Sequence, residues 1–114
     1  MPFADVHFTT GRMGDGTFVV SMAGPLGGAG GKPLTDELAA VLEAGATRVV
    51  IDLPGGSVLD RPALAVVEGA AARLREGGGE LVLVSHDPRV PGVITGHGLA
   101  GMVRVVPALV EALA

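Results

Sequence analysis

The sequence contains no cysteine, tryptophan or tyrosine, and it has no run of basic residues. The absence of cysteine excludes disulfides, thiol catalysis and thiolate metal ligands. Aromatic residues make up only 3% of the chain and the net charge is −4, so neither base stacking nor phosphate contacts favour a nucleic-acid partner. We therefore expect no nucleic-acid binding.

Long apolar runs are also absent, and the first residues do not combine a basic segment with an apolar stretch. We therefore expect no membrane insertion and a cytoplasmic protein. Hydrophobic residues make up 48% of the chain, which is enough apolar surface for a core. With 114 residues the chain has the size of one ordinary domain, and we expect residues 1–114 to form one.

Glycines and prolines separate the apolar runs, and the periodicity of these runs predicts the order β-β-α-β-α-β-α-β-α. Strands are predicted at Phe3–Thr10, Thr17–Gly24, Thr47–Leu53, Glu80–Ser85 and 102–106. Helices are predicted from Leu34 to a stop at Gly45, from Pro62 to the glycines at 77–79, within 87–98, and from Pro107 onward. Asp36 and Glu37 are expected near the positive end of the first helix.

Alternation of strands and helices implies parallel strands joined by right-handed crossovers. Strands two to five in chain order would place the helices on one face, with Phe3–Thr10 as an antiparallel edge strand. The strands at 47–53 and 80–85 are apolar on both faces, so the second face should be partly covered or should bind a partner or a second copy as a homodimer. The predicted core includes Val50, Ile51, Leu64, Val67, Leu74, Leu83 and Val105.

Patterns for catalysis and for cofactor binding are incomplete. The glycine-rich stretch at 24–35 is no phosphate-binding loop, because Leu26 replaces its first glycine and Pro33 replaces its hydroxyl residue. His7, His86 and His97 lack zinc-ligand spacing. We therefore expect no cofactor and no metal.

A Ser/His/Asp arrangement could in principle come from Ser57, His86 and Asp60, but no nucleophile-elbow pattern surrounds Ser57. We therefore expect no catalytic residue and no enzyme. Asp60 can place its carboxylate at the start of the second helix, with Arg61 as the cap and Pro62 as the first helical residue. His86 and Asp87 follow the fourth strand at its carboxyl end, where α/β sheets place functional loops, so they are candidate site residues.

The run from Val49 to Val84 resembles the central part of a STAS domain, the fold of bacterial anti-sigma-factor antagonists. The shared features are an apolar strand ending in Asp-Leu, a short turn, an apolar-Asp motif opening a helix, then glycines and an apolar strand. Residues 16–26 are similar to the family's second strand, and residues 96–114 are similar to its usual ending. The resemblance implies an α/β, STAS-like mixed five-stranded sheet with four mainly parallel strands in chain order and helices mostly on one face.

In typical antagonists, the second hydroxyl of an Asp-Ser-Ser/Thr-Gly motif is phosphorylated by a partner kinase that is also the anti-sigma factor, and this switches binding off. Here Asp60 matches the family aspartate, Arg61 the first hydroxyl position, Pro62 the phosphoacceptor and Ala63 the glycine. Gly27 stands where many antagonists carry an aspartate. Since proline has no hydroxyl, no phosphorylation is expected at this position.

The resemblance thus implies a non-enzymatic protein-interaction domain in signal transduction and transcription regulation. It would bind an anti-sigma-factor kinase of the ATPase type without phosphorylation control, or a changed partner. The expected partner-binding residues are Gly27, Val58, Leu59, Asp60, Arg61, Pro62, His86 and Asp87. Two alternatives remain open: a structural subunit of a lipid-transport ABC complex or sensory assembly, and a small-ligand-binding or enzymatic α/β domain with a pocket at Asp60, His86 and Asp87.

Overall fold

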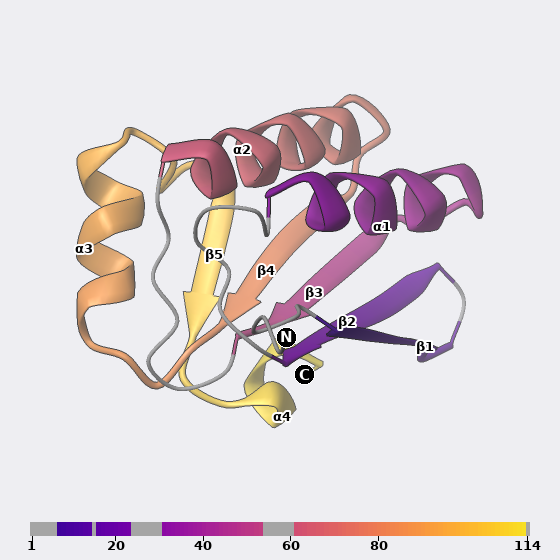
Figure 1. The fold of residues 1–114 in the computed structure, drawn as a ribbon, viewed down its shortest axis with the longest axis horizontal. Coiled ribbons are helices and arrows are strands. Elements are labelled where there is room, and N and C mark those ends of the chain that lie inside the picture. Colours follow the sequence, from indigo (N-terminus) through magenta and orange to yellow (C-terminus); the bar gives the residue numbers. More distant parts are fainter. Residues whose placement is uncertain (1–6, 15, 24–30, 54–60, 114) are drawn as a thin grey trace, which may run out of the picture.

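The fold is built on one mixed five-stranded sheet whose strands lie in chain order (Figure 1). The structure is a computed structural model that describes residues 7–14, 16–23, 31–53 and 61–113. The strands are β1 (His7–Arg12), β2 (Thr17–Ala23), β3 (Arg48–Asp52), β4 (Glu80–Val84) and β5 (Val103–Val106). β1 pairs antiparallel with β2 and all later pairs are parallel, so the predicted topology is confirmed.

Three helices cover one face of the sheet and a fourth lies on the other (Figure 1). The larger layer consists of α1 (Gly31–Glu43), α2 (Arg61–Glu76) and α3 (Arg89–Gly96), and the helix on the opposite face is α4 (Leu109–Ala112). Each helix of the larger layer joins two neighbouring parallel strands, and right-handed crossovers put all three on the same side. α4 follows the last strand, so no crossover confines it to that layer. The prediction of helices mostly on one face is confirmed.

The edge strand ends further along the chain than predicted. β1 continues to Arg12 because Gly11 and Arg12 still pair with Val19 and Phe18 of β2. Residues 3–6 of the predicted strand lie outside the described residues. β1 and β2 are therefore separated by only four residues, 13–16, of which residue 15 lies outside the described residues.

Two helix starts differ from the prediction. α1 begins at Gly31, before Leu34, so no acidic residue lies in its first turn, and Asp36 and Glu37 are too far along to act on its N-terminal dipole. α4 begins at Leu109, because Ala108 has an extended conformation (φ −141°, ψ 147°). Pro107 therefore precedes the helix without opening it.

The helix ends are as the glycines predict. Gly45, Gly78 and Gly98 have φ values of +94°, +80° and +72°, in the left-handed region that glycine adopts at little cost. After α2, the Gly79 N–H donates to the Leu74 carbonyl at 2.7 Å, which is the long-range bond of a Schellman closure. Gly79 is also required sterically, because a Cβ at this position would lie 2.0 Å from the carbonyl oxygen of Thr47.

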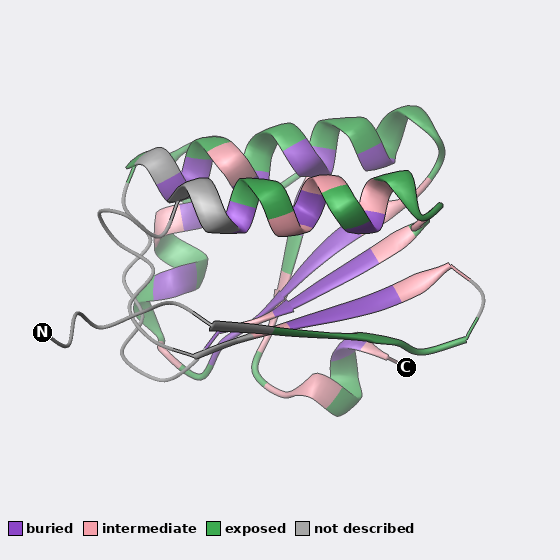
Figure 2. Cartoon of the chain, turned by 45° about the vertical axis from the view of Figure 1, so that its right-hand side comes forward, coloured by how far each residue is buried: buried purple, intermediate pink, exposed green. Residues whose placement is uncertain are grey.

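The core has two parts, one on each side of the sheet (Figure 2). Six of the seven predicted core residues are buried: Val50, Ile51, Leu64, Val67, Leu74 and Leu83. Val105 is only half-buried, because β5 is an edge strand with a neighbour on one side only. The prediction that Val105 is buried in the core is therefore wrong.

The second face of the sheet carries a small apolar cluster under α4. Val19, Val50, Val82 and Val84 are buried there together with Ala112 of α4. Around them the same face carries polar side chains, and the Arg48 guanidinium donates to the Ala112 carbonyl at 3.4 Å. The two-sided apolar character of the central strands is thus accounted for by α4. Val110 of α4 is 74% exposed on this side of the sheet, and the partner or second copy predicted for this face stays a prediction.

We predict that Leu74→Ala lowers the free energy of unfolding by about 2–5 kcal/mol, because Leu74 is only 3% exposed and its truncation leaves a cavity under α2. Urea denaturation followed by circular dichroism measures the change. Val110→Ala is the matched control, because Val110 is 74% exposed and should change stability by no more than about 0.5 kcal/mol. Equal effects of the two substitutions would contradict the burial of the α2 stripe.

Candidate protein-interaction surface

The carboxyl ends of β2, β3 and β4 meet at one edge of the sheet, and the predicted site residues His86 and Asp87 follow β4 there (Figure 1). α2 and α3 both begin beyond this edge. Four of the predicted residues, Gly27, Val58, Leu59 and Asp60, lie outside the described residues. Arg61, Pro62, His86 and Asp87 are described at least in their backbone.

The start of α2 carries a positive charge, that of Arg61. The helix begins at Arg61, which makes Pro62 its second residue and shifts the predicted cap by one position. Proline is tolerated there because its missing N–H would have no intrahelical acceptor. The Arg61 side chain is exposed, and within the described residues it makes no hydrogen bond or ion pair. The N-terminal end of the helix dipole adds to this positive charge.

Asp87 is held by Arg89 at the start of α3. Its Oδ1 accepts hydrogen bonds from the Arg89 backbone N–H at 2.9 Å and from Arg89 Nε at 3.0 Å. Its Oδ2 lies 2.6 Å from Arg89 Nη2, and its own N–H donates to Ser85 Oγ at 3.1 Å. These bonds favour the ionised carboxylate and lower the pKa of Asp87 to about 2, the side-chain bond from Arg89 contributing most.

The Asp87 carboxylate therefore has a structural role that accounts for its position. It satisfies an N–H group at the start of α3 and fixes the turn after β4. His86, next to it, is exposed at the same turn. Of this predicted pair, only His86 presents a side chain that is free for a partner.

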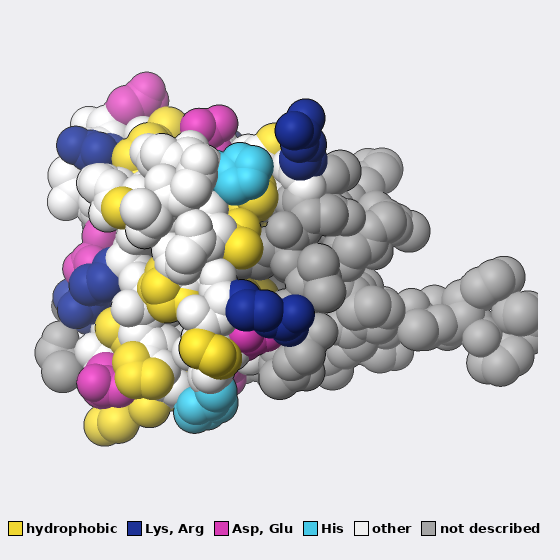
Figure 3. Space-filling model, turned by 90° about the vertical axis from the view of Figure 1, so that its left-hand side faces the viewer, with side chains coloured by type: hydrophobic (Ala, Val, Ile, Leu, Met, Phe, Trp, Pro, Cys, Tyr) yellow, Lys and Arg dark blue, Asp and Glu magenta, His cyan; other side chains and the backbone are white. Residues whose placement is uncertain are grey.

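A pocket of about 310 Å³ joins the start of α2 to the end of α3. Leu64 and Leu99 are buried beneath it, and its remaining lining residues are exposed: Arg61, Ala65, Glu68 and His97. Figure 3 shows the side of the molecule covered by α3, where charged and histidine side chains stand among mostly uncharged atoms.

His97 and Arg61 lie 36 positions apart, in different elements, and no local sequence pattern links them. The spacing of Arg61, Leu64 and Glu68 places them on one face of a helix, so the sequence alone could have identified these three lining residues. His97 comes from another element and reaches the pocket only through packing. The turn after α3 fixes its backbone: Gly98 has a positive φ, and the Leu99 N–H donates to the Ile94 carbonyl at 3.0 Å.

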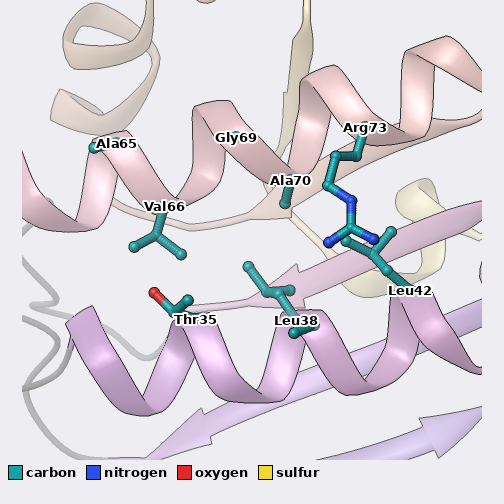
Figure 4. A pocket seen from close by; sticks show the side chains of 9 residues that line it. Thr35, Leu38, Leu42, Ala65, Val66, Gly69, Ala70 and Arg73 are labelled. Atoms are coloured by element: carbon teal, nitrogen blue, oxygen red, sulfur yellow. The ribbon is translucent and has the colours of Figure 1, made fainter.

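A second hollow of about 290 Å³ runs along the seam between α1 and α2 (Figure 4). Leu38 of α1 and Val66 of α2 point toward each other across it, and the Arg73 side chain extends over Leu42. Its lining is mostly apolar and contains small residues of α2 such as Gly69. It is the packing seam of the helical layer.

Other chemistries find no support in the part of the chain that the structure describes. Its residues contain no group of three His, Asp or Glu side chains arranged to hold a metal ion. None of its helices combines the length and apolar character that crossing a bilayer requires. The arrangement is that of a surface with a positive helix end, a turn locked by an ion pair, and a shallow pocket between two helices.

Comparison with known proteins assigns this α/β architecture to a family. The family model for the STAS domain matches residues 12–112, so the chain belongs to the STAS domain family. The chain is 33% identical over 93 residues to a Bordetella bronchiseptica protein named "Putative anti-sigma factor antagonist BtrV", covering 82% of this chain and 78% of that protein.

Solved structures agree on the fold. The anti-sigma factor antagonist SpoIIAA in its unphosphorylated form superposes with a TM-score of 0.74 at 18% identity, covering 94% of this chain and 93% of SpoIIAA. An anti-sigma factor antagonist from Mycobacterium paratuberculosis superposes with a TM-score of 0.70 at 25% identity, covering 96% of this chain and 92% of that one. The STAS-like fold expected from the sequence is confirmed.

We predict that Asp87→Asn lowers the melting temperature at pH 7 and that its effect shrinks as the pH falls from about 4 to about 2. The pKa of Asp87 is about 2 in the folded protein and 3.8 in a free aspartate. A lowered folded-state pKa contributes stability above the unfolded pKa, and that stability is lost as the pH falls through the folded value. Thermal melts of both proteins across this range measure the effect. A difference that does not depend on pH would show that the ion pair with Arg89 is not its source.

Proposed function

We propose that this protein is a non-enzymatic STAS domain, formed by residues 1–114, that binds an anti-sigma factor of the ATPase type without phosphorylation control at the family position. Binding uses the start of α2 and the neighbouring turns at the carboxyl edge of the sheet. The single observation that carries the proposal is the sequence LDRPAL within an otherwise family-like chain.

Family membership and relatives support the partner class. The Bordetella bronchiseptica relative, 33% identical over most of both chains, bears the name of an anti-sigma factor antagonist. The Mycobacterium paratuberculosis protein, at 25% identity, has the same description. An antagonist acts by binding its anti-sigma factor, so that is the partner we assign.

The residues at the start of α2 support the loss of phosphorylation control. A phosphate would add nearly two negative charges at this helix end. Arg61 and Pro62 occupy the two hydroxyl positions of the family motif, and neither can accept a phosphate. Ser57 is the nearest hydroxyl on the N-terminal side, but it precedes Asp60 and does not match the acceptor position.

Arg61 also changes what the surface can bind. Relative to serine it adds one positive charge, on an exposed side chain with no partner among the described residues. A partner surface that is acidic at this point would complement it, and such complementarity raises association rates and specificity. Because no phosphate can be added to Arg61 or Pro62, Arg61 can contact an acidic partner surface at all times. This agrees with binding that is not controlled by phosphorylation.

Enzymatic use of the same edge is disfavoured by Asp87. Its carboxylate is engaged by Arg89 and its pKa is about 2, far from the range in which a general acid or base works near neutral pH. Of the proposed pocket residues, Asp60 lies outside the described residues. A role in binding a protein partner requires no such titration.

We predict that incubation with an ATPase-type anti-sigma factor and ATP leaves residues 55–64 unmodified, as measured by intact mass and peptide mass spectrometry. The positive control is the triple variant Arg61→Ser, Pro62→Ser, Ala63→Gly, which restores the family motif and should gain one phosphate. Phosphate on this segment of the parent protein, including Ser57, would contradict the proposal.

We predict that Arg61→Glu slows association with the anti-sigma factor by roughly tenfold, because it replaces attraction by repulsion at the partner surface. Surface plasmon resonance at low salt measures the rate. Arg73→Glu is the matched control, because Arg73 lies on the same helix but on the side facing α1. Absence of any binding by the parent protein would refute the proposed function, and an unchanged rate for Arg61→Glu would remove Arg61 from the interface.

A further inference from the structure

The pocket between α2 and α3 has an uneven charge along its length. Arg61 lies at the first residue of α2 and Glu68 lies seven residues later, about 10 Å along the helix at 1.5 Å per residue. His97, from the end of α3, completes the exposed polar lining. The pocket therefore offers two groups that can donate hydrogen bonds and carry positive charge, and one carboxylate.

These three side chains are free among the described residues. In the described part of the chain, the side chains of Arg61, Glu68 and His97 make no hydrogen bond or ion pair. Some neighbouring charged groups are engaged: Asp87 with Arg89, and Arg75 with the Gly101 carbonyl at 3.2 Å. Three side chains without such a bond among the described residues meet at this one pocket, and its base is closed by Leu64 and Leu99.

We propose that this pocket receives a carboxylate side chain of the protein partner, held between Arg61 and His97, and that Glu68 borders the site and weakens the contact. The inference rests on the proposed function for the existence of that partner. A guanidinium forms two parallel hydrogen bonds to a carboxylate, and an imidazole N–H adds a third donor. The dipole of α2, positive at the Arg61 end, favours the same sign of ligand.

The opposite choice, a basic side chain paired with Glu68, fits the pocket less well. It would place a cation near Arg61, His97 and the positive end of α2, with a single exposed carboxylate to attract it. Glu68 has a different consequence for an acidic occupant, because it repels that occupant and holds the affinity below its maximum. The sign of the Glu68 effect therefore reports the charge of the occupant.

The test measures the Kd of single variants for the purified ATPase-type anti-sigma factor encoded in the same genome, by isothermal titration calorimetry at one salt concentration. Arg61→Gln and His97→Gln should each weaken binding, the first by at least about fivefold and the second by about two- to fivefold. Glu68→Gln should tighten binding by about two- to fivefold. Glu76→Gln is the matched control on the same helix, exposed and outside this pocket, and should leave the Kd unchanged.

The double variant Arg61→Gln, His97→Gln separates a shared ligand from two independent contacts. If both residues hold one carboxylate, the double variant should weaken binding by less than the product of the two single effects. Weaker or unchanged binding on Glu68→Gln, or strictly multiplicative effects of Arg61 and His97, would overturn the inference.

The failure of this inference differs from the failure of the proposed function. Binding that responds to Arg61→Gln but not to His97→Gln or Glu68→Gln would leave the anti-sigma factor as partner and remove the pocket from its interface. Absence of binding by the parent protein would overturn both. Since the three substituted side chains are exposed, circular dichroism spectra and melting temperatures close to those of the parent should accompany every variant.

Discussion

Burial of both faces of β3 and β4 is the constraint on which the rest of the structure depends. Val49, Val50 and Ile51 have no exposed surface, and neither do Leu81 and Val82 in the neighbouring strand. Side chains of a strand alternate between the two faces, so such runs need cover on both sides. α1, α2 and α3 supply it on one face, and the short α4 supplies it on the other.

This demand also places the functional edge. Each crossover helix of the larger layer returns the chain to the start of the next parallel strand, so α2 and α3 begin beyond the carboxyl ends of β3 and β4. Turns that contain glycine end these helices at their C-termini. Gly79 allows the chain after α2 to pass close to Thr47. The core thus carries the stability, while the pocket between α2 and α3 is lined by the exposed side chains of Arg61, Glu68 and His97.

Some charged side chains of the protein form ion pairs that hold the structure, and others remain free to contact a partner. Asp87 is committed to Arg89, and Glu80 lies between Arg48 at 3.3 Å and Arg104 at 3.6 Å at the other end of the sheet. Arg61 and His97 have no such commitment among the described residues. In the proposed function, a STAS domain without a phosphoacceptor recognises its partner by fixed charge, and these two exposed side chains are available for that contact.

Local sequence alone determined the elements, because apolar periodicity, glycine stops and β-branched runs act over a few residues. Local sequence therefore predicted the nine elements, their order, and six buried core residues, among them Val50 and Leu83. The order of the motifs along the chain indicated the STAS family. The observed starts of α1 at Gly31 and of α4 at Leu109 differ from the predicted starts at Leu34 and Pro107. No strong local sequence pattern marks these two boundaries. Tertiary structure alone decided that α4 covers the second face, that Val105 stays half-exposed on an edge strand, and that His97 lies across a pocket from Arg61. These outcomes join residues that are far apart in the chain, and only the packing of helices on the sheet determines which of them meet.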